Sequence, residues 1–250
     1  MITVDNLTKS FRKNRGEESL VVDHASFECG PGEVFGIIGS NGAGKTTLMR
    51  MLATIVPPTS GYACVAGFEI GRYPEAVRGN IGFVSPSHGL YDTMTVHEFL
   101  RYFGLLNGIS KHEIGEIVDE VIEWLKITEY AGMKCKKLST GIRQRVSIAR
   151  AVVHQPPVLL LDEPTNGLDV ESTRIVLDFI RSCRDEGQAV IFSTHIMDQA
   201  EEVCDRIALM HRGRILAIGT LAELSARTGA KRLADILARI TEPIDARSAK

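Results

Sequence analysis

The stretch Gly39-Ser40-Asn41-Gly42-Ala43-Gly44-Lys45-Thr46-Thr47 fits the pattern G-x-x-x-x-G-K-[ST] and follows the apolar run 34–38. The run predicts a strand, and a helix is expected over 44–51. Glycines let the backbone curl so that its N–H groups point inward, where the positive end of the helix dipole adds to them. Lys45 supplies a charge for phosphate groups, and the Thr46 hydroxyl is a ligand for Mg²⁺. The stretch therefore predicts a phosphate-binding loop, with a glycine-rich turn that binds nothing as the alternative.

Apolar runs rich in β-branched residues mark the rest of the first third, and glycine and proline clusters separate them. This pattern predicts strands joined by turns, at 2–7, 20–27, 62–65 and 81–84. From about residue 90 to 154 the apolar spacing is helical instead, over 95–106, 112–127 and 140–153.

Strand–helix alternation returns after residue 155. Strands are expected at 158–161, 189–193, 206–210 and 214–218, and helices at 170–184 and 197–203. One or two helices are expected over 221–240, with a frayed tail after Thr241. Such alternation predicts a largely parallel sheet covered by helices, into which a helical subdomain is inserted.

Composition limits the possible classes of protein. The 250 residues suffice for one large α/β domain, and a net charge of −2 gives no general attraction to nucleic acid or anionic lipid. Five widely spaced cysteines favour free thiols over a disulfide framework or a zinc site. The first residues do not resemble a signal peptide, and the apolar runs are shorter than the roughly 20 residues that cross a bilayer.

The segment 158–163 reads as a buried strand that ends in Asp162 and Glu163. Ligand sites in open α/β sheets lie at the carboxyl ends of strands, so both acids are expected beside the phosphate-binding loop. There Asp162 is expected to hold Mg²⁺ through water, and Glu163 to accept a proton from the water that attacks a γ-phosphate. An acid pair that only caps a helix is the alternative.

The segment Leu138-Ser139-Thr140-Gly141-Ile142-Arg143-Gln144-Arg145 opens the last helix of the expected subdomain. Ser139 is a natural N-cap, and Gly141 keeps the first turn free of bulk. Such a helix N-terminus is a second site for an anion, although the segment alone is also compatible with a simple capped helix.

Together these segments resemble the motifs of the ATP-binding domain of ABC transporters, over about residues 1–240. Residues 39–47 are similar to the Walker A motif, 138–145 to the signature L-S-x-G-x-x-Q-R, and 158–163 to Walker B with its catalytic glutamate. Gly167-Leu168-Asp169 resembles the D-loop, and Ser193-Thr194-His195 the switch histidine. The resemblance implies an α/β P-loop NTPase fold of the ABC-ATPase type, with an antiparallel β flank and an inserted α-helical subdomain.

The resemblance also implies a division of the chain. A single ABC ATPase domain is expected over 1–240, with a core of about 1–88 and 156–220 and a helical subdomain of about 89–155. A C-terminal helical extension and tail follow over 221–250.

In that family two domains pair head to tail, and each ATP lies between the Walker A loop of one and the signature of the other. Ser139 and Gly141 are thus expected to contact the γ-phosphate held by Lys45 of a second copy. His195 is expected to contact the γ-phosphate in its own chain and to link to Asp169 across the interface. Phe11 falls where the family places a ring against adenine, with a core or sheet-edge position as the alternative. The residues expected to catalyse hydrolysis are Lys45, Glu163 and His195.

One position departs from the family. Its glutamine at the entry to the helical subdomain, a ligand of Mg²⁺, is replaced here by Pro86, which has no ligating side chain. Water or one of Ser85, Ser87 and His88 is expected to take its place.

The implied function is ATP hydrolysis with Mg²⁺, by a homodimer on the inner, cytoplasmic face of the membrane that energises a separate permease, without nucleic acid. Exporters of drugs, sodium ions or polysaccharide are the most similar subfamily. An ABC-type ATPase of DNA maintenance would carry a long insertion between Gly44 and Ser139, a translation-type protein would carry two cassettes, and a P-loop kinase would have no use for the signature.

Overall fold

The computed structural model describes residues 1–12, 18–85 and 89–248, with the backbone alone for 243–248. Its centre is a six-stranded sheet in the order β10-β9-β3-β8-β7-β6. The strands are β3 (Glu33–Ile38), β6 (Ile81–Val84), β7 (Val158–Asp162), β8 (Ala189–Thr194), β9 (Arg206–His211) and β10 (Arg214–Gly219). All pair in parallel except β10, which is antiparallel to β9.

The central strands are buried on both faces, as expected for a parallel sheet between two layers. Along β7, Val158 and Leu160 pack with α1 (Lys45–Leu52) and the N-terminal strands. Leu159 and Leu161 alternate to the other face and pack against α6 (Val170–Asp185). An uninterrupted apolar run thus serves two cores at once.

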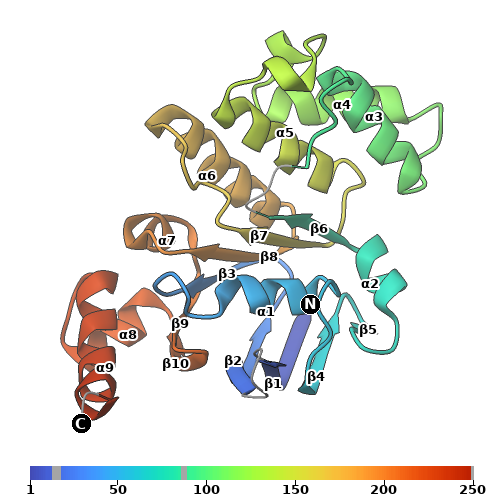
Figure 1. Cartoon of the computed structure of the whole chain (residues 1–250). Coiled ribbons are helices and arrows are strands. Elements are labelled where there is room, and N and C mark those ends of the chain that lie inside the picture. The colour runs from blue at the N-terminus through green and yellow to red at the C-terminus, as the bar shows by residue number, and fades with distance from the viewer. Residues whose placement is uncertain (13–17, 86–88, 249–250) are drawn as a thin grey trace.

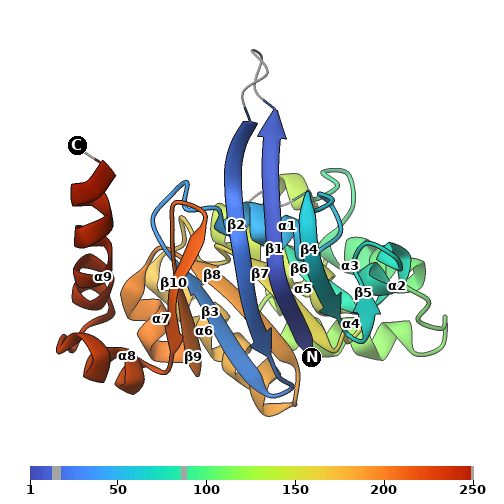
Figure 2. The ribbon, with the colours of Figure 1, turned by 90° about the horizontal axis from the view of Figure 1, so that it is seen from below.

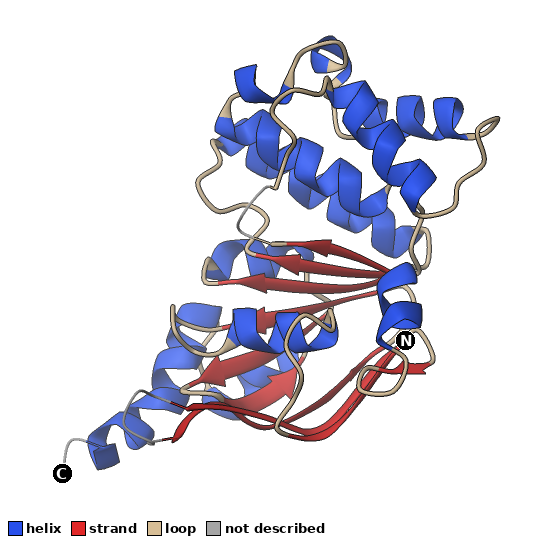
Figure 3. Ribbon diagram, turned by 45° about the vertical axis from the view of Figure 1, so that its right-hand side comes forward, coloured by secondary structure: helices blue, strands red, loops and turns tan. Residues whose placement is uncertain are grey.

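A second, antiparallel sheet in the order β2-β1-β4-β5 covers the α1 side (Figures 2 and 3). Its strands are β1 (Ile2–Arg12), β2 (Glu18–Cys29), β4 (Ser60–Val65) and β5 (Phe68–Glu69). Phe27 of this sheet stacks on Phe35 of β3 with ring centroids 4.9 Å apart, which joins the two sheets.

The helices α3 (Val96–Leu106), α4 (Ile114–Trp124) and α5 (Thr140–Val152) gather beyond β6 at one end of the sheet (Figure 1). Thr95 and Glu98 form a capping box that starts α3. Trp124 packs on Phe179 of α6 at a centroid distance of 4.5 Å, so the helical group is attached to the core. The helices of the expected subdomain and strand β6 of the core share one hydrophobic cluster. The boundaries of the helical subdomain at 88/89 and 155/156 therefore remain a prediction.

At the other end of the sheet, α8 (Leu221–Thr228) and α9 (Leu233–Ser248) lie beside β10 and α7 (Met197–Val203) (Figure 1). Leu224, Leu233 and Ile236 are buried in this small core. The expectation of a frayed tail after Thr241 is wrong, because α9 continues to Ser248. Extending an anchored helix adds one hydrogen bond per residue and needs no new nucleus.

The strands and helices expected from the sequence are confirmed, most of them with shifted ends. The strands expected at 2–7 and 20–27 are longer, and the helix expected from Gly44 begins at Lys45. The short α2 (Pro74–Gly79), β5 and two 3-10 turns, Thr128–Tyr130 and Cys135–Lys137, were not expected. The five cysteines are free, as predicted. Across the described residues, no helix has the length and apolar character needed to span a bilayer.

At Gly82, α5 approaches the main chain of β6 closely. A Cβ at this position would lie 2.3 Å from the Ala151 carbonyl oxygen and 2.7 Å from Leu159 Cδ2. The Ala151 contact is with backbone, so it cannot be relieved by a rotamer change. The lack of a side chain at Gly82 therefore allows α5 to pack this closely on β6.

We expect Gly82→Ala to lower the free energy of unfolding by about 1–3 kcal/mol, because it overpacks this contact. Gly115→Ala is the matched control: a Cβ there meets no described atom within 4 Å, and its position in α4 favours alanine by up to about 1 kcal/mol. Urea unfolding of both variants measures the two effects. Equal stability of Gly82→Ala and the unsubstituted protein would contradict the packing described.

Candidate nucleotide site

The phosphate-binding loop (residues 39–47) connects β3 to α1, as the sequence predicts. Gly44, the N-cap of α1, has φ +105°, and a Cβ there would lie 2.5 Å from the Val21 carbonyl oxygen. Glycine is thus required both by the backbone conformation and by the closeness of β2. The first N–H groups of α1 face the space that the loop encloses, where an anion is stabilised.

The turn between β9 and β10 supports this loop from outside. Gly213 N donates to the Ala43 carbonyl at 2.9 Å, and Asp23 N donates to the Gly213 carbonyl at the same distance. Asp23 also pairs with Arg214, so strand β2, the turn and the loop are tied together. Sequence reasoning missed this support: the glycine after Arg212 indicates only a turn, and its contact with the loop depends on the tertiary fold.

The loop borders a cavity of about 300 Å³. Glu163 reaches it from the end of β7, and Val21 of β2 closes one side. Asn166, which sequence reasoning missed, also lines it. The lining residues are Val21, Asn41, Gly42, Ala43, Gly44, Lys45, Thr46, Thr47, Glu163 and Asn166. The remaining loop residues, Gly39 and Ser40, contribute carbonyl oxygens that accept hydrogen bonds from Lys45 Nζ at 2.8 and 3.3 Å.

Three side chains expected to catalyse hydrolysis meet at the edge of this cavity. Lys45 Nζ lies 3.2 Å from Glu163 Oε1, and His195 Nδ1 lies 2.8 Å from Glu163 Oε2. Lys45 is 5% exposed and Glu163 9%, so the pair is shielded from water. Little water competes for these charges, which strengthens their interaction.

Glu163 has a left-handed backbone conformation, with φ +51°. This conformation is unfavourable for a non-glycine residue and persists only where the surroundings hold it. Its N–H donates to the Ser193 carbonyl at 3.1 Å and to Ser193 Oγ at 3.2 Å. The end of β8 thus fixes the direction in which the carboxylate leaves β7.

Asp162 is fully buried beside the same loop. Ser193 Oγ donates to its Oδ1 at 2.7 Å, whereas Oδ2 has no hydrogen-bond partner among the described residues. Burial raises the pKa of this carboxyl, and the hydroxyls of Ser193 and Thr46 act in the opposite direction. A buried acceptor without a partner, next to a hydroxyl, fits a divalent cation held with water. The donor set is therefore suitable for Mg²⁺.

The signature residues do not line this cavity. Ser139 caps α5, accepting a hydrogen bond from Ile142 N at 3.4 Å, and Gly141 lies beside Ser172 of α6. Asp169 caps α6 and bonds Ser172 through both carboxylate oxygens, at 2.7 and 3.2 Å. The structure thus joins Ser139, Gly141 and Asp169 into a second cluster, separate from Lys45.

Phe11 is 42% exposed on β1, which excludes the core position. It pairs with Ser19 of β2, two residues before Val21. Phe11 thus lies farther along the hairpin whose Val21 lines the cavity, and a register shift separates the two positions. Its contact with adenine stays a prediction.

The loop position where the family has its Mg²⁺-binding glutamine is not tested by the structure. Pro86, Ser87 and His88 lie outside the described residues, and Ser85 is half-buried directly after β6.

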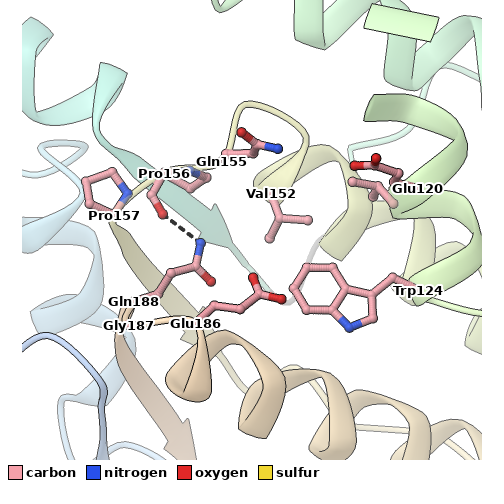
Figure 4. A pocket seen from close by; sticks show the side chains of 10 residues that line it. Glu120, Trp124, Val152, Gln155, Pro156, Pro157, Glu186, Gly187 and Gln188 are labelled. Atoms are coloured by element: carbon pink, nitrogen blue, oxygen red, sulfur yellow. Dashed lines mark hydrogen bonds between the residues drawn. The ribbon is translucent and has the colours of Figure 1, made fainter. Parts of the chain in front are cut away.

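A larger hollow, of about 600 Å³, lies at the opposite edge of the sheet between α4 and the segments that precede β7 and β8 (Figure 4). Trp124, Glu186 and Gln188 are among its lining residues. It carries none of the predicted phosphate-binding groups. The chemistry therefore assigns a nucleotide to the smaller cavity at the loop.

Known proteins are similar to this chain in sequence. Residues 22–166 match the family described as ABC transporter. The ABC transporter ATP-binding protein NatA of Bacillus subtilis (strain 168) is 38% identical over 225 residues, 90% of this chain and 91% of that protein. Nod factor export ATP-binding protein I of Paraburkholderia xenovorans (strain LB400) is 37% identical over 215 residues, 86% of this chain and 70% of its own.

A solved structure of the ATP-binding subunit of an ABC transporter has the same fold. It superimposes with a TM-score of 0.87 at 26% identity, and the match covers 97% of this chain and 100% of the chain in that structure. The fold, the order of the motifs and the relatives agree. This chain belongs to the ABC transporter family, as an ATP-binding and ATP-hydrolysing subunit.

Proposed function

We propose that Lys45, Glu163 and His195 form one half of a hydrolytic site that two copies of this chain complete, and that the energy passes to a separate membrane permease. The observation that carries the proposal is the shielded Lys45–Glu163–His195 arrangement at the edge of the loop cavity. It joins a phosphate-binding charge to a base within one hydrogen-bonded unit.

The phosphate-binding loop holds the triphosphate through its N–H groups and Lys45. Thr46 and Asp162 hold Mg²⁺, in keeping with the free Asp162 Oδ2. An Mg²⁺ ion held by these two residues would supply positive charge to the phosphate groups. Residues of the loop (Gly39, Ser40, Asn41, Gly42, Ala43, Gly44 and Thr47) supply the remaining backbone and side-chain contacts.

Glu163 acts as the general base for the attacking water. Before ATP binds, its carboxylate neutralises Lys45, which avoids leaving either charge alone in a shielded site. A γ-phosphate competes for Lys45 and frees one carboxylate oxygen for water. His195, at 2.8 Å from the other oxygen, keeps the carboxylate oriented and contacts the γ-phosphate.

The second half of the site is the cluster of Ser139, Gly141 and Asp169 on another copy. Within one chain this cluster does not line the loop cavity, although Ser139 offers a helix N-terminus suited to phosphate. A head-to-tail pair places it over the ATP of the other chain. The same pairing gives Asp169 access to His195 of the partner subunit.

The permease docks on the helical end of the molecule. Tyr91, Tyr102 and Leu106 are 46%, 42% and 66% exposed there, and Tyr91 contacts the rings of Tyr102 and Phe103 at 6.0 and 5.9 Å. Clustered exposed aromatic residues are typical of protein interfaces. The chain itself then works on the inner, cytoplasmic face of the membrane, without nucleic acid. Export as the direction of transport follows the Nod factor export relative.

We expect Glu163→Gln to lower kcat about 10²–10⁴-fold, because it keeps the shape of the side chain and removes its basicity. Binding of ATP should stay within a few-fold, since the loop is unchanged. Glu186→Gln, an exposed acid beside the hollow at the opposite edge of the sheet, is the control and should hydrolyse normally. Phosphate release under saturating ATP is the measurement, and near-normal turnover of Glu163→Gln would disprove its role as base.

Asp162→Asn tests the proposed Mg²⁺ ligand. We expect the Mg²⁺ concentration for half-maximal activity to rise about 10–100-fold, as for other residues that orient a metal site. Without nucleotide, the same variant should be more stable at neutral pH by about 1 kcal/mol, because a buried charge with a free oxygen is removed. Asp178 is exposed on α6, and Asp178→Asn, the control, should change neither the Mg²⁺ requirement nor the stability. An unchanged Mg²⁺ requirement in Asp162→Asn argues against the assignment.

A further inference from the structure

Gln144 connects the signature helix to the loop that follows the proposed base. It lies on α5, is 3% exposed, and its Nε2 donates to the Pro164 carbonyl at 2.8 Å. Pro164 comes directly after Glu163. A buried amide that reaches from one helix to the main chain of a catalytic loop is a strong, well-defined restraint on that loop.

The loop after β7 needs such a restraint. Glu163 is in a left-handed conformation that is unfavourable for its residue type, and Ser193 holds only its N–H side. On the carbonyl side, Gln144 fixes Pro164, and Thr165 Oγ1 donates to Gln199 Oε1 at 2.5 Å. Asn166 N donates to the Glu163 carbonyl at 3.1 Å, and Gln144 holds the next peptide group, between Pro164 and Thr165. Holding the main chain before and after Glu163 sets the direction of its carboxylate.

We propose that Gln144 is a positioning residue for Glu163: by holding the Pro164 carbonyl, it keeps the carboxylate aimed at the attacking water. This inference rests on the proposed role of Glu163 as general base. Gln144 touches neither substrate nor metal in this scheme. It acts through the loop, so its loss should reduce turnover and spare the binding of ATP.

The position of Gln144 on α5 gives the restraint a second consequence. Ser139, at the start of the same helix, is the group proposed to contact the ATP of the other copy, about 7.5 Å away along the helix axis at 1.5 Å per residue. One rigid helix therefore links the phosphate contact of one site to the base of the other. A shift of α5 when the two copies close would reach Glu163 through the Gln144–Pro164 bond.

The chain provides a matched control for this bond. Just before the amino end of β7, Gln188 Nε2 donates to the Pro156 carbonyl, also at 2.8 Å (Figure 4). Both bonds join a glutamine amide to a proline carbonyl next to β7, but only one of the two adjoins Glu163. A purely structural effect of losing such a bond should appear in both variants.

The experiment compares Gln144→Met with Gln188→Met, because methionine keeps the length of the side chain and removes the donor. Turnover at saturating ATP, the KM for ATP and the unfolding midpoint are measured for each. We expect kcat of Gln144→Met to fall about 10–100-fold with KM within three-fold, as for a misplaced catalytic group. Gln188→Met should keep kcat within two-fold.

If Gln144→Met does not remain folded, Gln144→Asn replaces it. Asparagine keeps a buried amide, but its side chain is about 1.5 Å shorter and does not reach the Pro164 carbonyl. The expected loss of kcat is the same. An equal change of kcat in the variants at 144 and 188, or a rise in KM that accounts for the whole effect at 144, overturns the proposal.

A double variant separates this inference from the function on which it rests. In single turnover, Gln144→Met added to Glu163→Gln should change the rate by less than two-fold, because both act through the same carboxylate. A further ten-fold loss means that Gln144 acts independently of Glu163, which refutes the inference. Near-normal turnover of Glu163→Gln alone refutes the proposed base itself.

Discussion

The parallel pairing of β3, β8 and β7 is the constraint on which the site depends. Parallel strands end at one edge, so the residues that follow these three strands meet there. Lys45 comes after β3, Glu163 after β7 and His195 after β8. The Glu163 carboxylate contacts Lys45 Nζ at 3.2 Å and His195 Nδ1 at 2.8 Å. Burial of the strands on both faces keeps this edge rigid.

The pairing of Lys45 with Glu163 also explains how the protein tolerates two shielded charges before ATP arrives. A lone buried charge is costly, whereas an opposite charge and well-formed hydrogen bonds offset much of that cost. The same chain holds Ser139, Gly141 and Asp169 in a separate cluster around Ser172. This separation is the reason for our proposal that one copy holds a half-site and that a second copy completes it.

Much of this was predictable from sequence, because periodicity marks the buried strands and the loop and acidic motifs carry their own chemistry. The fold and the family resemblance are confirmed. Glu163 contacts Lys45, and Asp162 lies beside Thr46 of the same loop, as expected for acids at the end of this strand. The supports were not predictable. Gly213, Ser193 and Gln144 act through contacts with residues at least 20 positions away. Ser193 and Gln144 stand in recognised motifs, but a motif does not show which distant residue a side chain contacts. The helix beyond Thr241 was missed because it extends α9, whose earlier residues Leu233 and Ile236 are anchored in a small core that only the tertiary fold creates.

The most direct test of the shared site mixes two inactive chains. Lys45→Ala damages the phosphate-binding loop, and Ser139→Arg damages the signature cluster. In a mixed pair both lesions fall in one composite site and leave the other intact. Equal amounts that pair at random should regain up to about a quarter of normal turnover, since half the pairs are mixed and each has one intact site. No recovery on mixing, together with full activity of an unsubstituted monomer, would contradict the shared site.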